Sequence, residues 1–258
     1  MRMLVHLRKH GETLFPYDYQ YALSSVIYSK LRCAREDLAA RLHASRGFKF
    51  YSFSNLLLKK CEFLESGLKF NEADLVISSP DREFIATFAE GLLASPEFTM
   101  LKRKFTVESL EVLECSRLGS REVLRTLSPI LVRTLRDENG EKKEWELYPS
   151  DGKFYDNLHR NLVERYTAFY EHPPKEDIFE ITKVLEVRPK RINIDGTPRR
   201  CSHMVFELTA SPEMVSFAYD AGLGERQAMG FGCVEVERRG GKGEEVVHRE
   251  RKRNHHKL

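Results

Sequence analysis

The order of predicted strands and helices is the sequence feature that most limits how this chain can fold. The first part is predicted to run as strand, helix, helix, strand, strand, helix and strand, at residues 3–7, 16–33, 35–47, 48–58, 74–79, 80–95 and 98–115. The second part is predicted to run as strand, helix, strand, strand, helix and strand, at residues 121–135, 151–172, 177–194, 201–210, 211–224 and 230–238. The same plan therefore occurs twice.

A strand, helix, two strands, helix and strand in this order are typical of a ferredoxin-like domain. The sequence thus predicts an α+β protein with two tandem ferredoxin-like (RRM-like) domains and a central cleft between them. We expect the first domain at residues 1–118 and the second at 119–239. Glycines and alternating charges at 240–258 predict a basic, disordered tail.

Composition limits the class of protein further. Of the 258 residues, 41% are hydrophobic, enough for a sizeable core, and 31% are charged, which argues against a membrane protein. No stretch reaches membrane-spanning length, and the five cysteines are scattered without a C-x-x-C pair, which favours free thiols in a reducing cytoplasm. The net charge of +3 conceals two basic runs, at 188–200 and 249–257, that suit an anionic partner.

A glycine-rich segment near the C-terminus, "AYDAGLGERQAMGFGCVEVERR", lies between a predicted helix and a predicted strand. Its four glycines form two Gly-apolar-Gly pairs, Gly222, Gly224, Gly230 and Gly232. No G-K-[ST] follows and the loop does not open a helix, which excludes a P-loop and a dinucleotide fingerprint. One interpretation is a helix cap and a β-bulge; the other is that the missing side chains allow a ligand to approach the backbone closely.

Three side chains near the N-terminus could carry out phosphodiester transfer. Tyr28, His43 and Lys49 fall on the first predicted helix, at the end of the second, and at the entry of a strand. Each alone has an ordinary structural explanation. Tyr28 can be an aromatic residue on a helix, His43 a histidine at a helix terminus, and Lys49 a solvated surface charge. Together they provide a phenol, an imidazole and an ammonium, which can move protons and neutralise charge without a metal.

A different chemistry is suggested by "RKHGET" and the later "SSPDREF". This pair loosely resembles the histidine phosphatases, in which His10 would be the phosphorylated nucleophile and Arg82 a phosphate clamp. Lys9 replaces the arginine that should precede the histidine, and no later H-G pair supplies a second histidine.

A closer resemblance covers residues 16–236. The segments "PYDYQYALSSVIYSKL", the "LH" before "SRGFKFYSFS", "RPKRINI" and "GLGERQAMGFG" resemble the CRISPR-associated endoribonucleases of the RAMP superfamily, the sixth Cas protein family. The resemblance implies that Tyr28, His43 and Lys49 are catalytic and that the four glycines belong to an RNA-binding signature loop. It implies cleavage of CRISPR repeat RNA in the precursor transcript, with no cofactor.

The basic run "RPKRINIDGTPRR" is the second predicted RNA contact. We expect a face that binds the RNA backbone, formed by Arg188, Lys190, Arg191, Arg199 and Arg200. The alternative is a charged strand edge that prevents aggregation. The expected partners are single-stranded repeat RNA and subunits of a CRISPR effector complex, with the chain as a monomer or homodimer. The main alternative function is a RAMP subunit that holds crRNA without cutting it.

Overall fold

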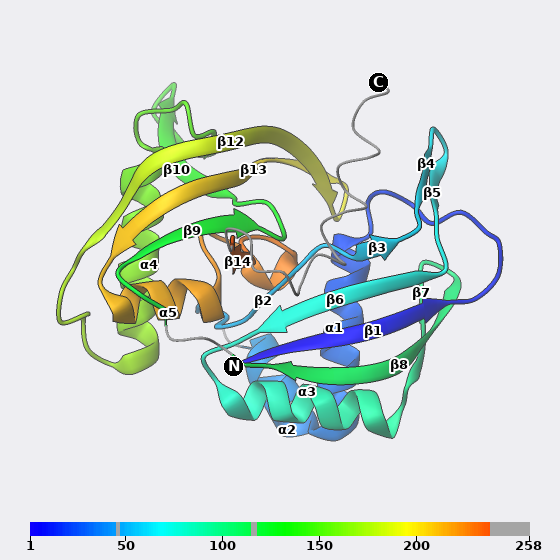
Figure 1. Cartoon of the computed structure of the whole chain (residues 1–258). Coiled ribbons are helices and arrows are strands. Elements are labelled where there is room, and N and C mark those ends of the chain that lie inside the picture. Colours follow the sequence, from blue (N-terminus) through cyan, green and yellow to red (C-terminus); the bar gives the residue numbers. More distant parts are fainter. Residues whose placement is uncertain (45–46, 115–117, 238–258) are drawn as a thin grey trace.

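The computed structural model describes residues 1–44, 47–114 and 118–237, without the side chains of His43 and Ala44. The described part of the chain forms two main antiparallel sheets, one in each half, with helices packed against them, and two smaller two-stranded sheets (Figure 1). No helix in the described part of the chain is both long and apolar enough to span a membrane. The predicted disordered tail at 240–258 lies outside the described residues.

The first domain extends from β1 to β8. Its elements are β1 (Arg2–Lys9), α1 (Gln20–Ala34), α2 (Glu36–Ala44), β2 (Ser52–Phe53), β3 (Leu57–Lys59), β4 (Glu62–Leu64), β5 (Gly67–Lys69), β6 (Glu72–Ser78), α3 (Arg82–Ala94), β7 (Glu97–Met100) and β8 (Arg103–Leu113). The main sheet has the order β2-β6-β1-β8-β7, with β3 also paired to β6. Strand β1 is central because it pairs with both β6 and β8.

The second domain repeats this arrangement with longer strands. Its elements are β9 (Arg121–Thr126), β10 (Val132–Glu138), β11 (Glu141–Leu147), α4 (Phe154–Tyr170), β12 (Phe179–Ile194), β13 (Thr197–Ala210), α5 (Pro212–Ala221), the 3-10 helix η1 (Gln227–Met229) and β14 (Val234–Val236). The sheet order is β12-β13-β9-β14, again with the first strand between the third and fourth core strands. The predicted fold class, two tandem ferredoxin-like domains, is therefore confirmed. The boundary at 118/119 and the central cleft stay predictions.

Helix α1 begins later than the sequence predicts. The predicted start was Pro16, but the first helical residue is Gln20. Phe15 forms an isolated β-bridge with Leu68, and its backbone N–H and C=O are both bonded to that residue at 2.8 Å. These two hydrogen bonds hold the segment before α1 in an extended conformation. The predicted apolar ridge of α1 is confirmed, because Leu23, Ile27 and Leu31 are fully buried.

The segment 121–135 also differs from the prediction. It is not one strand, because the chain leaves β9 at Thr126 and begins β10 only at Val132. Strand β10 then pairs with β11, a strand that the sequence analysis did not predict, in a separate two-stranded sheet. Asn139 and Gly140 both have positive φ at the turn, as a two-residue hairpin of this kind requires.

The two domains pack against each other, and hydrogen bonds join the first domain to three segments of the second. Ser24 Oγ of α1 donates to the Ala228 carbonyl at 2.6 Å, and the Asn55 N–H donates to the Leu127 carbonyl at 3.0 Å. The Arg2 guanidinium lies over the Tyr219 ring and donates to the backbone carbonyl of the same residue at 2.6 Å. The first domain is thus held to α5, η1 and the chain around β9, which fixes how α1 is presented.

Candidate active site and RNA-binding surface

The three predicted catalytic residues lie on elements that meet in the first domain. Tyr28 is on α1, His43 is in the last turn of α2, and Lys49 follows α2. Helices α1 and α2 pack against each other. The Lys49 ammonium donates a hydrogen bond to the carbonyl of Leu42, the residue immediately before His43. Lys49 is thereby placed at the C-terminal end of α2, while the His43 side chain lies outside what the structure describes.

Tyr28 reaches the same region through Tyr51. The two rings are in edge-to-face contact, with centroids 6.5 Å apart, and Tyr51 is only two residues after Lys49. Tyr51 is fully buried and stacks on Phe84 of α3, so it offers Tyr28 a rigid neighbour. Tyr28 and Lys49 are therefore brought to one part of the molecule, Tyr28 by its contact with Tyr51 and Lys49 by its hydrogen bond to the end of α2.

Burial changes the acid–base properties of both groups. It raises the pKa of the half-buried Tyr28 phenol above its ordinary value, because the phenolate would lose hydration. It lowers the pKa of the Lys49 ammonium for the same reason. At neutral pH the Tyr28 phenol therefore stays protonated, and it can donate a hydrogen bond but is poorly suited to remove a proton.

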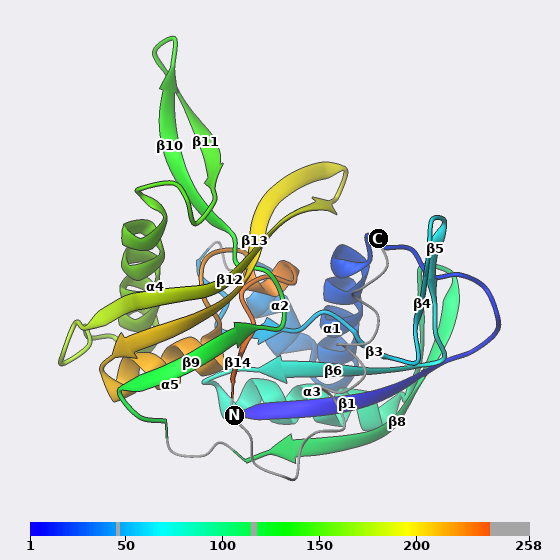
Figure 2. The same cartoon turned by 45° about the horizontal axis from the view of Figure 1, so that its top comes forward.

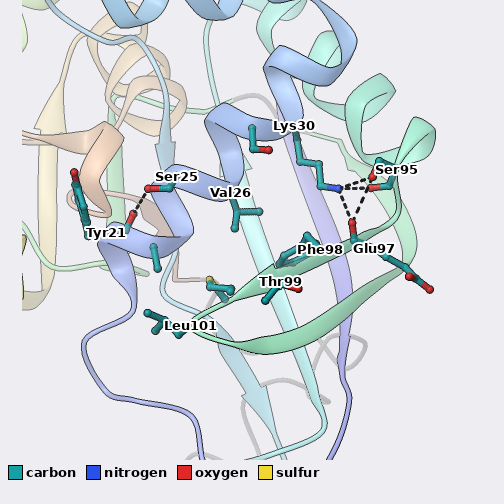
Figure 3. A pocket seen from close by; sticks show the side chains of 12 residues that line it. Tyr21, Ser25, Val26, Lys30, Ser95, Glu97, Phe98, Thr99 and Leu101 are labelled. Carbon is teal, nitrogen blue, oxygen red and sulfur yellow. Dashed lines mark hydrogen bonds between the residues drawn. The ribbon is translucent and has the colours of Figure 1, made fainter.

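A hollow of about 560 Å³ lies beside α1, but it does not coincide with this cluster. It is open between α1 and β7, and its lining includes Tyr21, Ser25 and Lys30 but not Tyr28 or Lys49 (Figure 3). The Lys30 ammonium points away from solvent to the Ser95 and Glu97 carbonyls. Lys30, the one cation in this lining, thus holds α1 against the start of β7 and is not available to a ligand in the hollow.

The phosphatase interpretation is wrong in this fold. Arg2 pairs with Ser78 and Arg8 pairs with Glu72, so the start of α3 lies beside the beginning of β1. Arg82 is therefore at one end of β1 and His10 at the other, on the order of 20 Å apart for a strand of this length. His10 instead contacts Thr106 Oγ1, with its Nε2 at 2.7 Å. The two groups cannot hold one phosphate.

The glycine-rich loop is buried, and its glycines are required by its packing against both domains. All four, Gly222, Gly224, Gly230 and Gly232, are buried and have positive φ. Gly222 also ends α5, as one sequence interpretation predicted, with its N–H donating to the Ala218 carbonyl at 3.0 Å. A Cβ at Gly224 would lie 2.5 Å from the Leu131 carbonyl oxygen.

The space beside these glycines is therefore filled by the protein itself. A Cβ at Gly222 would meet Ser52 of β2, and one at Gly230 would meet Gln20 of α1. The apolar residues between the paired glycines, Leu223 and Phe231, are fully buried, as the sequence analysis expected of anchors. The absence of side chains is thus explained by contact between the domains at Gly222 and Gly230, and by packing within the second domain at Gly224 and Gly232. RNA contact by this loop stays a prediction, and it would involve the partly exposed residues between the glycine pairs, Glu225, Arg226 and Met229.

Arg165 supports the loop and was not predicted from the sequence. It is fully buried on α4, and its two terminal nitrogens donate to the carbonyls of Gly222 (2.8 Å) and Ala221 (2.6 Å). Burial lowers its pKa to about 9, which still leaves it charged at neutral pH. A cation at the C-terminal end of α5 is also favoured by the helix dipole. Its position in an amphipathic helix gave no signal of this role.

The five basic residues on β12 and β13 separate into two groups. Arg188, Lys190 and Arg191 are exposed on β12. Arg199 instead donates to Glu146 Oε1 at 3.0 Å, and the Arg200 guanidinium lies 4.3 Å from the centroid of the Tyr148 ring. The last two thus pack against the β10–β11 hairpin and its end, and only the first three face solvent as the prediction requires.

Two ferredoxin-like domains joined through a buried glycine-rich loop define a RAMP-type protein, and comparison with known proteins agrees. Models of the N-terminal and C-terminal parts of CRISPR-associated protein Cas6 match residues 14–111 and 113–236. The CRISPR-associated endoribonuclease Cas6 1 of Methanocaldococcus jannaschii is 37% identical over 91% of this chain and 92% of its own length. This chain belongs to the CRISPR-associated Cas6 family.

Solved structures show the same relationship. A CRISPR-associated protein Cas6 is 36% identical, with a TM-score of 0.83 over 92% of this chain and 99% of its own. A structure described as a RAMP protein binding different RNA substrates is 32% identical, with a TM-score of 0.85 over 92% of this chain and all of its own. A relative from Pyrococcus horikoshii, 33% identical over 86% of this chain and 93% of its own length, is described as a CRISPR-associated endoribonuclease-like protein.

Proposed function

We propose that this protein is an endoribonuclease that cleaves CRISPR repeat RNA in the precursor transcript and so releases crRNAs. The observation that carries this proposal is the match, at 37% identity over 91% of the chain, to a relative described as a CRISPR-associated endoribonuclease. The placement of Lys49 at the end of the helix that holds His43, and of Tyr28 against Tyr51 two residues after Lys49, supports it.

In this proposal the nucleophile is the 2′-hydroxyl next to the scissile phosphate. Its oxygen attacks phosphorus, the bond from phosphorus to the 5′-oxygen breaks, and the products are a 2′,3′-cyclic phosphate and a 5′-hydroxyl. His43 donates the proton that the leaving 5′-oxygen takes up, since an imidazole with an ordinary pKa near 6.5 exchanges protons at neutral pH. The proton of the 2′-hydroxyl is lost to solvent or to a basic group at the site.

Tyr28 and Lys49 have supporting roles in this step. Because burial raises the pKa of Tyr28, its protonated phenol orients the 2′-hydroxyl by a hydrogen bond and does not act as the base. The Lys49 ammonium neutralises the charge that grows on the non-bridging phosphate oxygens, an effect that is usually large in such reactions. Its hydrogen bond to the Leu42 carbonyl fixes the ammonium close to the backbone of His43.

RNA binding is assigned to the exposed part of the basic run. Arg188, Lys190 and Arg191 would contact the sugar-phosphate backbone from β12. The glycine-rich loop would contribute mainly by holding α1, through the hydrogen bond from Ser24 to Ala228, one helical turn from Tyr28. This division separates residues that hold RNA from the element that positions the catalytic helix.

The experiment is incubation of the purified protein with repeat RNA from the arrays of its source, in EDTA. We expect one cut per repeat, with cyclic phosphate and 5′-hydroxyl ends. The same RNA with a single 2′-deoxy substitution at the cut site should bind but remain whole. Binding of the all-ribose RNA without cleavage would instead support the non-catalytic subunit, and efficient cleavage of the 2′-deoxy substrate would refute the proposed mechanism.

A further inference from the structure

The β10–β11 hairpin carries a stack of aromatic and guanidinium groups that the proposed reaction does not use. The Arg136 guanidinium carbon lies 4.3 Å from the Trp145 ring centroid, and that of Arg200 lies 5.2 Å from the same ring. Arg200 is in turn 4.3 Å from the Tyr148 ring. Two cations from different strands are thus gathered on one indole, at a hairpin that projects from the second domain away from α1 and α2 (Figure 2).

The register of the hairpin places this stack on one face. Thr134 pairs with Trp145 and Arg136 pairs with Lys143, so Arg136 and Trp145 point to the same side of the two-stranded sheet. Arg136 is exposed, whereas Trp145 and Arg200 are half-buried. The planar groups are therefore accessible from solvent at the Arg136 end and anchored at the other.

Both faces of the hairpin carry ion pairs in which positive and negative charges compensate. On the opposite face Arg133 bonds to Glu144 and Glu225, and nearby Arg199 bonds to Glu146. On the face of Arg136, Lys143 bonds to Glu138. Within the described chain, neither Arg136 nor the Arg200 guanidinium has a carboxylate at ion-pair distance. Their charge is balanced only by the faces of aromatic rings, which leaves most of their hydrogen-bond donors for a ligand.

An uncompensated guanidinium next to an indole suits one class of ligand. Phosphate oxygens accept paired hydrogen bonds from guanidinium groups, and an unpaired nucleobase stacks on a guanidinium or aromatic plane. Both features occur together in an unpaired nucleic acid strand, whereas a duplex hides its base faces. The exposed Arg191 of β12 pairs with Arg200 of β13, so the two side chains share a face and Arg191 extends the positive surface from this stack.

We propose that Arg136, Trp145 and Arg200 form a binding site for single-stranded RNA, in which the guanidiniums hold phosphate oxygens and a base stacks on the Arg136–Trp145 pair. The choice of RNA as ligand rests on the proposed function. The site lies outside the catalytic cluster, so it adds affinity for a stretch of RNA away from the cut and does not take part in the reaction.

The sequence provides a direct probe, because Trp145 is the single tryptophan of the chain. Its fluorescence can be followed while repeat RNA with a 2′-deoxy cut site is added, and total binding can be measured in parallel by filter retention. We expect RNA to quench the fluorescence at the concentrations at which it is retained. Trp145→Ala should weaken retention roughly 5–150-fold, the range for loss of one base-stacking contact.

Arg136→Gln tests the site without removing the ring that packs on the domain. It should lower the salt slope of binding by about 0.7, with the single-turnover rate at saturating RNA unchanged. Lys142→Gln is the matched control, because it removes a cation from the opposite face of the same hairpin, and its slope and quenching should stay closer to those of the wild type.

The possible results separate this proposal from the proposed function. Retention of RNA with unchanged Trp145 fluorescence and a wild-type slope for Arg136→Gln would overturn the hairpin site and leave the nuclease standing. Quenching by the 2′-deoxy RNA, with all-ribose RNA bound but uncut, would support the site and count against the nuclease. Failure of the wild-type protein to retain repeat RNA would overturn both.

Discussion

Gly224 provides a test of whether the glycine-rich loop is a packing element. The perturbation is Gly224→Ala, compared with Gly196→Ala in the β12–β13 turn. The two glycines have nearly the same φ, +77° and +76°, but a Cβ at Gly224 would lie 2.5 Å from the Leu131 carbonyl oxygen, while one at Gly196 would meet nothing within 4 Å. The pair therefore separates the cost of steric overlap from the cost of a left-handed backbone.

The magnitude follows from these two environments. A left-handed alanine costs about 1–2 kcal/mol at either position, and the loss of unfolded-state entropy is shared as well. At Gly224 the backbone must also move to relieve the overlap, although the Glu225 N–H is bonded to the same Leu131 carbonyl at 2.8 Å. Overpacking of this kind adds roughly 1–3 kcal/mol. At about 3 °C per kcal/mol for a chain of this size, Gly224→Ala should melt roughly 3–9 °C below Gly196→Ala.

The assay is thermal unfolding without RNA, followed by circular dichroism. The absence of RNA matters because any loss then belongs to the protein alone. If the two variants melt within about 1 °C of each other, the packing explanation is refuted. If Gly224→Ala weakens RNA binding without lowering the melting temperature, the result would instead support direct contact between the loop and the RNA backbone.

The remaining predictions concern catalysis, binding and the support of the loop. His43→Ala should reduce the single-turnover cleavage rate about 10²–10⁴-fold with little change in RNA affinity; weakened binding to the same extent would mean that the imidazole holds RNA. Because burial raises the pKa of Tyr28, the ratio of wild-type to Tyr28→Phe cleavage rates should stay constant from pH 6 to 8, whereas an anionic base would make it rise about tenfold per pH unit. Changing Lys190 and Arg191 together to alanine should lower the salt slope of RNA binding by about 1.4, or about 0.7 for each phosphate contact; an unchanged slope in filter binding would remove them from the interface. Arg165→Met should lower the free energy of unfolding in urea by about 3 kcal/mol, because two buried carbonyls lose their charged donor; a loss below about 1 kcal/mol would show that water replaces it.

The strand and helix order could be predicted from the sequence because it depends on local periodicity. Leu23, Ile27 and Leu31 mark the buried side of α1 at helical spacing, and they are buried in the structure. The position of the α1 start could not be predicted, since it is set by the pairing of Phe15 with Leu68, a contact between residues distant in sequence. Strand β11 was missed although Asn139-Gly140 is a typical hairpin turn, because its charged residues mask the alternation.

The candidate site shows the same division. Residue chemistry and the family resemblance suggested Tyr28 and Lys49 as partners, but only the folded chain shows burial shifting both pKa values. The four glycines could be recognised as one motif in the sequence, but the reason why glycine is required at each position could not. What fills the space beside Gly224 is the Leu131 carbonyl, and a sequence gives no indication of which backbone will be there.

The hydrogen bond between Ser24 and Ala228 joins residues 204 positions apart, and this has a consequence for how the protein is made. A chain emerging from the ribosome can complete the first sheet once β8 has been synthesised, since N-terminal domains fold as units during translation. The sides of α1 and β2 that meet the glycine-rich loop then stay uncovered until residues 222–232 appear. The helix that carries Tyr28 thus receives its final support only when the second domain is nearly complete.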